Sequence, residues 1–307
     1  STPSNSSAAS DVYKRQIEIG CGKGEFLTML CELGENRGVG FDPSYVYGRS
    51  DSETAENITF IRDFYSERYA SYKGDFICCR HTLEHIQYPK DFLTTVRRAI
   101  GDRQSTVVFF EVPNVLLTLR DLAIWDIIYE HCSYFSPGSF VRLFTLCGFN
   151  VRKITETFEG QFLCIEALPG EVRTNVEFDG CENLEQRVSE TTAFGSNYRR
   201  KVEKWTLTLE ELKRLGKRTV LWGAGSKGVT FLNSLNIRDQ IEYVVDINPH
   251  KYGMYVAGTG QKIVPPEFLR DYRPDIVIMT NPIYRDEIQR FMMNMDLTAE
   301  LVVDNYC

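Results

Sequence analysis

The sequence contains no long hydrophobic run, no cluster of basic residues and no Cys-x-x-Cys pair. No stretch approaches the roughly 18 apolar residues of a membrane span, and the N-terminus lacks the apolar middle region of a signal peptide. Arginine and aromatic residues do not alternate, and the net charge is -7, so nucleic acid is not an expected partner. These absences predict a cytoplasmic protein that binds neither a membrane nor nucleic acid.

The nine cysteines follow neither a disulfide pattern nor a zinc pattern. Their number is odd, they are scattered along the chain, and several lie in apolar segments, which favours buried thiols in a reducing compartment. Cys78 and Cys79 are adjacent and would point to opposite faces of a strand. We therefore expect no zinc site.

The composition is that of a globular protein, with 43% hydrophobic and 25% charged residues in 307 residues, and this length favours two domains. Residues 1–16 are rich in serine, alanine and asparagine, lack a starting methionine, and run abruptly into the first apolar strand. We expect them to form a disordered tail or an artificial junction, with the natural protein beginning further upstream.

Residues 17–42 have the pattern of a nucleotide-binding half-unit. An apolar strand leads into the sequence EIGCGKG, an apolar helix follows, and a second strand ends at Asp42. Glycines let the backbone approach a ligand, the helix N-terminus offers N–H groups, and an acid about 20 residues on can bind ribose hydroxyls. The carboxylate of Glu18 would repel phosphate, so the loop favours a cationic ligand. The alternative is a glycine turn that serves only packing.

The run Glu-x-Gly-x-Gly-x-Gly resembles motif I of class I methyltransferases, whose donor S-adenosylmethionine carries a sulfonium, an ammonium group and a ribose diol. The resemblance implies that Asp42 accepts hydrogen bonds from both ribose hydroxyls. In this family an acid and an apolar residue after the third strand bind the adenine, and Asp63 and Phe64 match them; a helix N-cap is the alternative role for Asp63. The implied donor-binding residues are Glu18, Gly20, Cys21, Gly22, Gly24, Asp42, Asp63, Phe64 and Arg80.

A fourth strand at residues 75–79 is followed by the sequence RHTLEHI, which resembles the family segment that covers the donor and faces the acceptor. His81 and His85 are spaced to share a helical face, a spacing also found in metal sites, but no third ligand is evident and we predict no metal. We assign His85 to the acceptor pocket and His81 to substrate binding. Helix capping or a core position is the alternative for either histidine.

The fifth strand, residues 105–112, ends in the sequence EVPN. Ligands of open α/β sheets lie at the carboxyl ends of the strands. We therefore place Glu111 and Asn114 at the mouth of the pocket, with Pro113 fixing the turn.

Residues 125–136 mix aromatic, acidic, imidazole and hydroxyl groups, which are expensive to bury without a use. The segment resembles the Glu-His followed by Ser-Tyr-Phe of sugar C-methyltransferases, in which the histidine is the general base. The resemblance implies catalytic roles for His131 and Glu130. The family form Tyr-His-Glu-His differs from the sequence here, so Tyr129 is displaced by one position and Tyr134 is a second candidate phenol. The alternative is a loop whose histidine caps a helix.

From residue 182 the pattern becomes helical, with a narrow apolar seam in which Trp205 and Leu209 lie. A second half-unit follows: a strand, the sequence GAGSKG, an apolar helix, and a strand ending at Asp246. It lacks an acid before the glycines and adds a lysine, so it favours an anion such as the pyrophosphate of a nucleotide sugar. The candidate substrate-binding residues here are Gly223, Gly225, Ser226, Lys227 and Asn281. A loop that only packs is the alternative.

The sequence therefore predicts an α/β protein with a class I methyltransferase Rossmann-like sheet, a helical connector and a second, smaller Rossmann-like α/β domain. Their bounds are residues 17–168, 169–216 and 217–307. The whole resembles the nucleotide-sugar C-methyltransferases, although the cysteine-rich N-terminal zinc-binding module of that family is missing from this sequence.

The resemblance implies transfer of a methyl group from S-adenosylmethionine to a carbon next to the carbonyl of a nucleoside-diphosphate 4-keto-6-deoxysugar, bound between the domains, in deoxysugar biosynthesis. His131 takes the proton with help from Glu130, and Tyr129, Tyr134 or His85 donates to the oxyanion. The alternatives are a small-molecule O- or N-methyltransferase, an NAD-dependent sugar-nucleotide oxidoreductase and a ligand-gated scaffold.

Overall fold

The computed structural model describes residues 14–34, 36–47, 57–171, 183–235 and 237–304. The chain divides into two compact units: Ser1–Val115 with His131–Asn183, and Leu116–Glu130 with Leu184–Cys307. Of the predicted N-terminal tail, residues 1–13 lie outside the described part, whereas Arg15 and Gln16 already belong to the first strand. The fold therefore begins earlier than the sequence pattern indicated.

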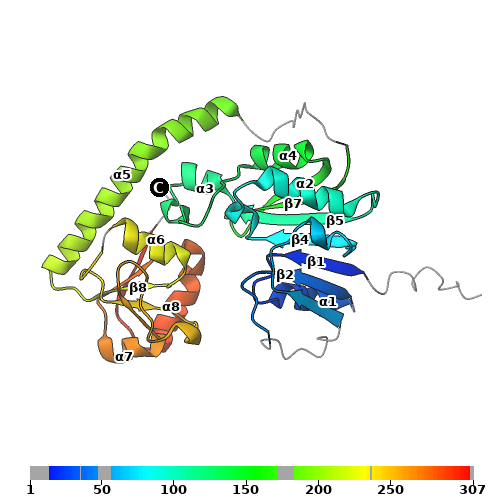
Figure 1. The fold of residues 1–307 in the computed structure, drawn as a ribbon. Coiled ribbons are helices and arrows are strands. Elements are labelled where there is room, and N and C mark those ends of the chain that lie inside the picture. Colours follow the sequence, from blue (N-terminus) through cyan, green and yellow to red (C-terminus); the bar gives the residue numbers. More distant parts are fainter. Residues whose placement is uncertain (1–13, 35, 48–56, 172–182, 236, 305–307) are drawn as a thin grey trace, which may run out of the picture. The chain divides into compact units, whose positions relative to one another are not determined.

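The first unit contains a seven-stranded sheet in the order β3-β2-β1-β4-β5-β7-β6 (Figure 1). Its strands are β1 (Arg15–Ile19), β2 (Arg37–Phe41), β3 (Ile58–Ile61), β4 (Phe76–Arg80), β5 (Val107–Pro113), β6 (Phe149–Thr157) and β7 (Phe162–Pro169). Its helices are α1 (Glu25–Gly34), α2 (Pro89–Ile100) and α4 (Pro137–Leu146), with the short 3-10 helices η2 (Glu67–Tyr69) and η3 (Leu83–His85). Strand β7 runs antiparallel to both of its neighbours, and the other pairs are parallel. The predicted Rossmann-like α/β sheet is confirmed.

Alternate residues of the central strand β1 serve opposite faces of this sheet. Ile17 and Ile19 are buried in the core that α2 and α4 also line, together with Phe110 and Phe144. Glu18 lies between them in sequence and faces the other side, where it contacts α1. The acid of the glycine loop is thus held between sheet and helix.

The loop from His131 to the start of α4 is fixed at its far end. Ser136 caps α4 by accepting a hydrogen bond from the Ser139 amide (3.3 Å), and the Ser139 hydroxyl accepts one from the Ser136 amide (2.9 Å). Such a reciprocal cap satisfies two N–H groups at the helix start. One residue earlier, Phe135 pairs with Asn114 at the end of β5. This anchoring limits where the His131 side chain can lie.

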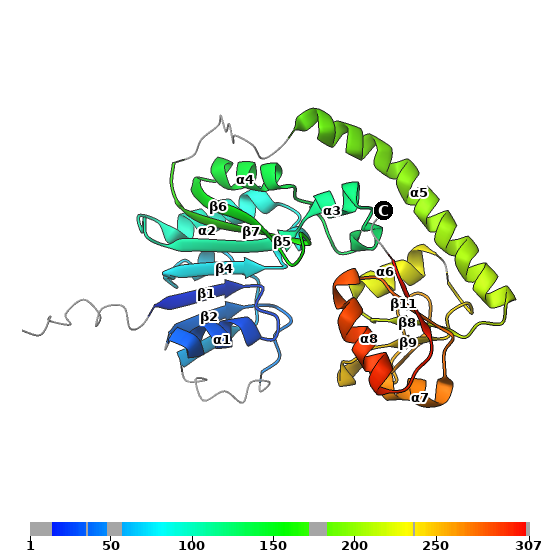
Figure 2. The same cartoon turned by 180° about the vertical axis from the view of Figure 1, so that it is seen from behind.

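The second unit has a five-stranded parallel sheet in the order β10-β9-β8-β11-β12 (Figure 2). Its strands are β8 (Thr219–Trp222), β9 (Tyr243–Val245), β10 (Lys262–Val264), β11 (Ile276–Met279) and β12 (Glu300–Val303). Its helices are α3 (Val115–Arg120), of which Val115 is counted with the first unit, α5 (Leu184–Arg214), α6 (Ser226–Ser234), α7 (Leu269–Tyr272) and α8 (Arg285–Asn294), with 3-10 helices η4 (Ile124–Asp126), η5 (Pro249–Lys251), η6 (Pro266–Phe268) and η7 (Pro282–Tyr284). The second, smaller parallel sheet is confirmed.

The two faces of this smaller sheet carry separate cores. On one face Trp205 and Leu209 of α5 pack with Phe231 of α6, so the helix predicted as a connector contributes to the core of the second unit. Trp125 joins the same core, with its ring 4.9 Å from that of Phe231. Its indole N–H also donates to Asp304 (2.7 Å). A segment from the middle of the chain is therefore part of the second unit.

Among the described residues, the cysteines are free thiols, and all except Cys132 are buried. No helix in that part of the chain combines the length and the apolar character that crossing a membrane requires.

Candidate active site

A cavity of about 860 Å³ lies in the first unit at the ends of β1, β2, β3 and β4. Ligands of parallel α/β sheets bind at this edge. Most residues predicted to bind the donor line it, namely Glu18, Gly20, Cys21, Gly22, Asp42, Asp63, Phe64 and Arg80. Gly24 differs, because a Cβ there would come within 2.4 Å of the Phe60 ring. Close packing therefore accounts for Gly24, and the prediction of a donor contact is not supported there.

Two glycines of the loop have backbone conformations that other residues rarely adopt. Gly20 and Gly22 have φ angles of 75° and 52°, and a Cβ at Gly20 would lie 1.9 Å from Oγ1 of Thr82. Position 20 therefore requires glycine. Cys21 lies in this loop, and burial raises the pKa of its thiol to about 12, so the thiol stays protonated.

Glu18 is a buried acid in the cavity wall, with 3% of its surface exposed. Its Oε2 accepts a hydrogen bond from the Leu27 amide in the first turn of α1 (3.1 Å). Burial raises the pKa of Glu18 to about 7, although the charge of Arg80 and this hydrogen bond oppose the shift. The charge that would attract a cation is consequently dependent on pH near neutrality.

Asp42 is held at the end of β2 by the loops on either side. Its Oδ2 accepts a hydrogen bond from the Gly22 amide (2.8 Å), and its Oδ1 accepts from the amide and the hydroxyl of Ser44 (2.7 and 2.6 Å). The carboxylate is therefore oriented before any ligand binds, as a group that recognises a diol should be.

Asp63 is fixed by its neighbours and does not cap a helix. It accepts a hydrogen bond from the Phe64 amide (2.8 Å) and from the Tyr69 hydroxyl, and it pairs with Arg68. The following 3-10 helix begins after Ser66, so the N-cap alternative is wrong. Phe64 is 74% exposed and offers an apolar surface at the rim of the cavity.

Arg80 and Glu111 form an ion pair beside the cavity, with Nε and Oε2 separated by 2.6 Å. Glu111 is 8% exposed. Its charge balances Arg80, so it does not stand open at the pocket mouth as predicted. Asn114 is also buried, and its amide donates to the Gly160 carbonyl (3.0 Å). Neither Glu111 nor Asn114 lines the cavity, so the structure does not support the predicted substrate contacts of these two residues.

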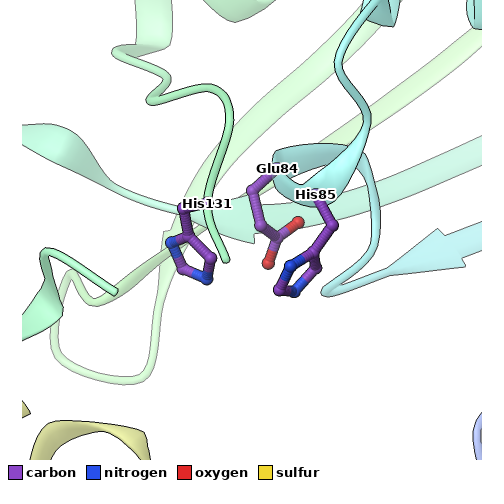
Figure 3. A group of neighbouring side chains, drawn as sticks. All are labelled: Glu84, His85 and His131. Carbon is purple, nitrogen blue, oxygen red and sulfur yellow. The ribbon is translucent and has the colours of Figure 1, made fainter. Parts of the chain in front are cut away.

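Three ionisable side chains, Glu84, His85 and His131, meet near the cavity (Figure 3). The atoms that each offers as a ligand lie within 4.8 Å of one another. The two imidazole rings are 4.9 Å apart and nearly perpendicular, and His85 lines the cavity. Burial raises the pKa of Glu84 to about 7. The group can therefore exchange protons near neutral pH.

This group also corrects the sequence-based account of the histidines. His81 has a φ of 49° and precedes η3, so it does not share a helical face with His85. Its ring packs edge-on against Phe162 (4.6 Å), and burial lowers the pKa of His81 more than Glu111 raises it. The sequence predicts no metal because no third ligand is evident near His81 and His85. The fold instead brings Glu84, His85 and His131 together, so that reason does not hold.

The remaining predicted catalytic residues differ in their placement. The ring of Tyr134 lies 5.9 Å from that of His131, and Tyr134 is 39% exposed. Tyr129 is 98% exposed. Glu130 is exposed and belongs to the second unit, and the carboxyl group close to His131 within the first unit is that of Glu84.

Two family models match the chain. Residues 5–154 match a family described as "Methyltransferase domain", and residues 181–303 match one described as "C-methyltransferase C-terminal domain". The first match contains the glycine loop, Asp42 and the histidine group. The chain is a methyltransferase in which a methyltransferase domain precedes a C-methyltransferase C-terminal domain. Its methyl donor is S-adenosylmethionine, and its second domain is of the C-methyltransferase type.

This methyltransferase is 25% identical over 290 residues to the C-methyltransferase NovU from Streptomyces niveus, an alignment that covers 89% of the chain and 67% of NovU. Among solved structures, the N,N-8-amino-8-demethyl-D-riboflavin dimethyltransferase RosA from Streptomyces davawensis is 18% identical, with a TM-score of 0.42, over 52% of this chain and 50% of RosA. A SAM-dependent methyltransferase from Archaeoglobus fulgidus is also 18% identical, with a TM-score of 0.39, over 52% of this chain and 87% of its own.

The second glycine loop of the methyltransferase is less suited to an anion than its sequence indicated. Gly223 has a φ of 104°, and α6 begins at Ser226 after Gly225, as expected. Lys227, however, pairs with Asp126 of the same unit, with Nζ and Oδ2 separated by 2.9 Å. The charge on which the pyrophosphate prediction depended is therefore already balanced.

The acid of this second half-unit is also engaged. Asp246 accepts hydrogen bonds from the Ala224 amide (2.9 Å) and from Nζ of Lys251 (3.0 Å). Asn281 accepts a hydrogen bond from the Ile283 amide (3.4 Å) at the start of η7. Asp246, the acid of the second half-unit, and Asn281, a predicted substrate-binding residue, thus stabilise turns of their own domain.

Sequence reasoning missed Glu84, Thr82 and Ser44. Ser44 follows Asp42 by two residues, and this spacing is typical of a turn in which the aspartate accepts hydrogen bonds from the later residue. Glu84 stands between Leu83 and His85 in a segment predicted to line the pocket. An acid beside an apolar residue in such a segment was the available signal of a buried carboxyl group.

Proposed function

We propose that this methyltransferase methylates a carbon next to the carbonyl of a nucleoside-diphosphate 4-keto-6-deoxysugar. The second-domain match and the similarity to NovU support carbon as the acceptor atom. The observation that carries the proposal is the pair of neighbouring imidazoles, in which His85 lines the donor cavity and the His131 ring lies 4.9 Å from that of His85. Transfer to carbon requires removal of a proton, and an imidazole is suited to that near neutral pH.

The chemistry assigns a role to each of these side chains. A carbon next to a carbonyl becomes nucleophilic when its proton leaves and the charge is held as an enolate. His131 takes this proton, and His85 or Tyr134 donates to the developing oxyanion. Tyr129, at 98% exposure, is a poor donor because water competes for its hydroxyl. The carbanion then attacks the activated methyl in line, so positioning supplies much of the acceleration.

The donor is assigned to the glycine-loop side of the cavity. Asp42 accepts hydrogen bonds from the ribose hydroxyls, and Asp63 and Phe64 contact the adenine. Glu18 attracts the positive charge of S-adenosylmethionine. The pre-oriented oxygens of Asp42 and the burial of Glu18 support this arrangement.

S-adenosylmethionine should bind about eight times more weakly at about pH 6 than at about pH 7.5. With a pKa of about 7, Glu18 is about one-tenth ionised at the lower pH and about three-quarters ionised at the higher, and only the ionised form attracts the cation. Calorimetric titration measures both affinities. Glu18→Gln is the control, because it removes this dependence and leaves the titration of the ligand itself. The same pH ratio in both proteins would contradict the role of Glu18.

The acceptor class is tested with methyl-labelled donor and a panel of nucleoside-diphosphate sugars. Each 4-keto-6-deoxysugar is paired with its 4-hydroxy counterpart, which lacks the carbonyl that stabilises the enolate. We expect label only in keto sugars, on carbon and stable to hydrolysis. Label on oxygen or nitrogen, or equal transfer to the 4-hydroxy sugars, would replace the proposal with an O- or N-methyltransferase.

A further inference from the structure

The buried carboxyl group of Glu84 faces both imidazoles of the histidine group (Figure 3). Glu84 is 2% exposed, and its Oε2 has no hydrogen-bond partner among the residues that the structure describes. A buried oxygen atom without a partner is costly, and a catalytic role is one of the reasons for which proteins retain such atoms. His85 and His131 present ring nitrogens within 4.8 Å of the ligand atom of Glu84.

The backbone of Glu84 holds the loop that carries the second histidine. Its carbonyl oxygen accepts hydrogen bonds from the amides of Cys132 (2.7 Å) and Ser133 (3.1 Å). The same residue thus anchors the main chain just after His131 and directs a carboxyl group at its ring. Glu130 precedes His131 in the sequence, but its side chain is exposed.

We propose that Glu84, and not Glu130, is the positioning residue of the general base: its carboxylate orients the His131 imidazole and balances the charge when that ring takes the proton. This inference rests on the proposed function, in which His131 is the base. The proton moves from the acceptor carbon to a nitrogen of His131, and the electron pair stays on the acceptor as the enolate. Glu84 touches neither the donor nor the acceptor.

The surroundings of Glu84 set the sign of its effect. The ionisable groups that face it are His81, at 3.9 Å from its Oε1, Cys79 on β4, Glu111 on β5, and the two imidazoles. Burial dominates, and Glu111 adds repulsion, so the pKa of Glu84 is raised to about 7. An ionised Glu84 stabilises the imidazolium form of His131; removing that charge should therefore lower the pKa of His131.

The first test needs no acceptor. The chain has four histidines, so nitrogen NMR of histidine-labelled protein, assigned with a His131→Gln variant, can follow the His131 ring through a pH titration. In Glu84→Gln the midpoint should fall by at least about half a pH unit. In the matched control Glu130→Gln it should stay at the wild-type value. Equal titration of His131 in wild type and Glu84→Gln would overturn the inference.

The second test measures solvent deuterium exchange into a keto-sugar acceptor. In Glu84→Gln the exchange rate should fall about 30-fold, and the acid limb of its pH profile should move to lower pH. In Glu130→Gln the exchange rate should stay within about two-fold of the wild-type rate. Should Glu84→Gln fail to fold, Glu84→Asp, which keeps the charge on a shorter side chain, should show an intermediate midpoint. The inference would be overturned if His131 titrated in Glu84→Asp with the wild-type midpoint. It would also be overturned if the purified protein contained stoichiometric metal bound by the two imidazole rings.

The two tests separate this inference from the proposed function. Lost exchange in His131→Gln with normal exchange in Glu84→Gln would remove only Glu84. The opposite result is a shifted His131 titration in Glu84→Gln together with no deuterium exchange into any keto sugar by the wild-type protein. It would remove the keto-sugar assignment and keep the coupling between Glu84 and His131.

Discussion

Replacing His131 with glutamine should lower solvent deuterium exchange at the acceptor carbon by about 1,000-fold, because glutamine cannot take a proton at neutral pH. Affinity for S-adenosylhomocysteine should stay within about two-fold, because the cavity residues that we assign to the donor lie in or directly after β1, β2 and β3, and His131 does not line the cavity. Mass spectrometry of the acceptor in deuterated water measures the exchange, and calorimetry measures the affinity.

The matched control is His250→Gln, which changes an exposed histidine in the second unit and should exchange normally. Exchange retained in His131→Gln would remove His131 from the role of base. Parallel losses of exchange and of S-adenosylhomocysteine affinity would show that His131 supports the donor site instead.

Asp304→Asn should lower the free energy of unfolding of the second unit by about 3 kcal/mol. The Asp304 carboxylate accepts hydrogen bonds from the indoles of Trp125 and Trp205 (both 2.7 Å) and pairs with Lys201 (2.9 Å). Both Asp304 and Lys201 are buried. The substitution leaves a buried lysine without its counter-charge, which is costlier than losing a surface pair.

Urea unfolding followed by tryptophan fluorescence measures this change. The three tryptophans of the chain, Trp125, Trp205 and Trp222, all belong to the second unit, so their signal reports on that unit alone. Asp239→Asn removes an exposed pair with Lys213 and should leave the midpoint unchanged. Equal midpoints for the two variants would show that the Asp304 network does not stabilise the unit.

The parts of the candidate site that the structure places where the sequence predicts them belong to one short segment. The strand, the glycine loop, the helix and Asp42 succeed one another within residues 17–42, and their geometry follows from local rules: glycine at positive φ, an N–H-rich helix start and an acid at a strand end. The predicted place of Glu111 at the pocket mouth was wrong, because its surroundings depend on residues far apart in the sequence. Its ion pair with Arg80 joins neighbouring strands that are distant in the sequence, and a strand end alone does not reveal which side chains will pair there.

The sequence by itself determined two Rossmann-like α/β sheets, a methyltransferase glycine loop and the presence of His131 in a segment rich in ionisable and aromatic groups. Local periodicity and turn chemistry suffice for these, because they depend on residues close together in the chain. The tertiary structure decided which carboxyl group lies close to His131, since Glu84 is 47 positions away and approaches it only when β4 and β5 are paired and the loop is anchored. It also decided that Trp125 packs with the second unit, because burial of a large apolar side chain depends on surfaces that only the folded chain brings together.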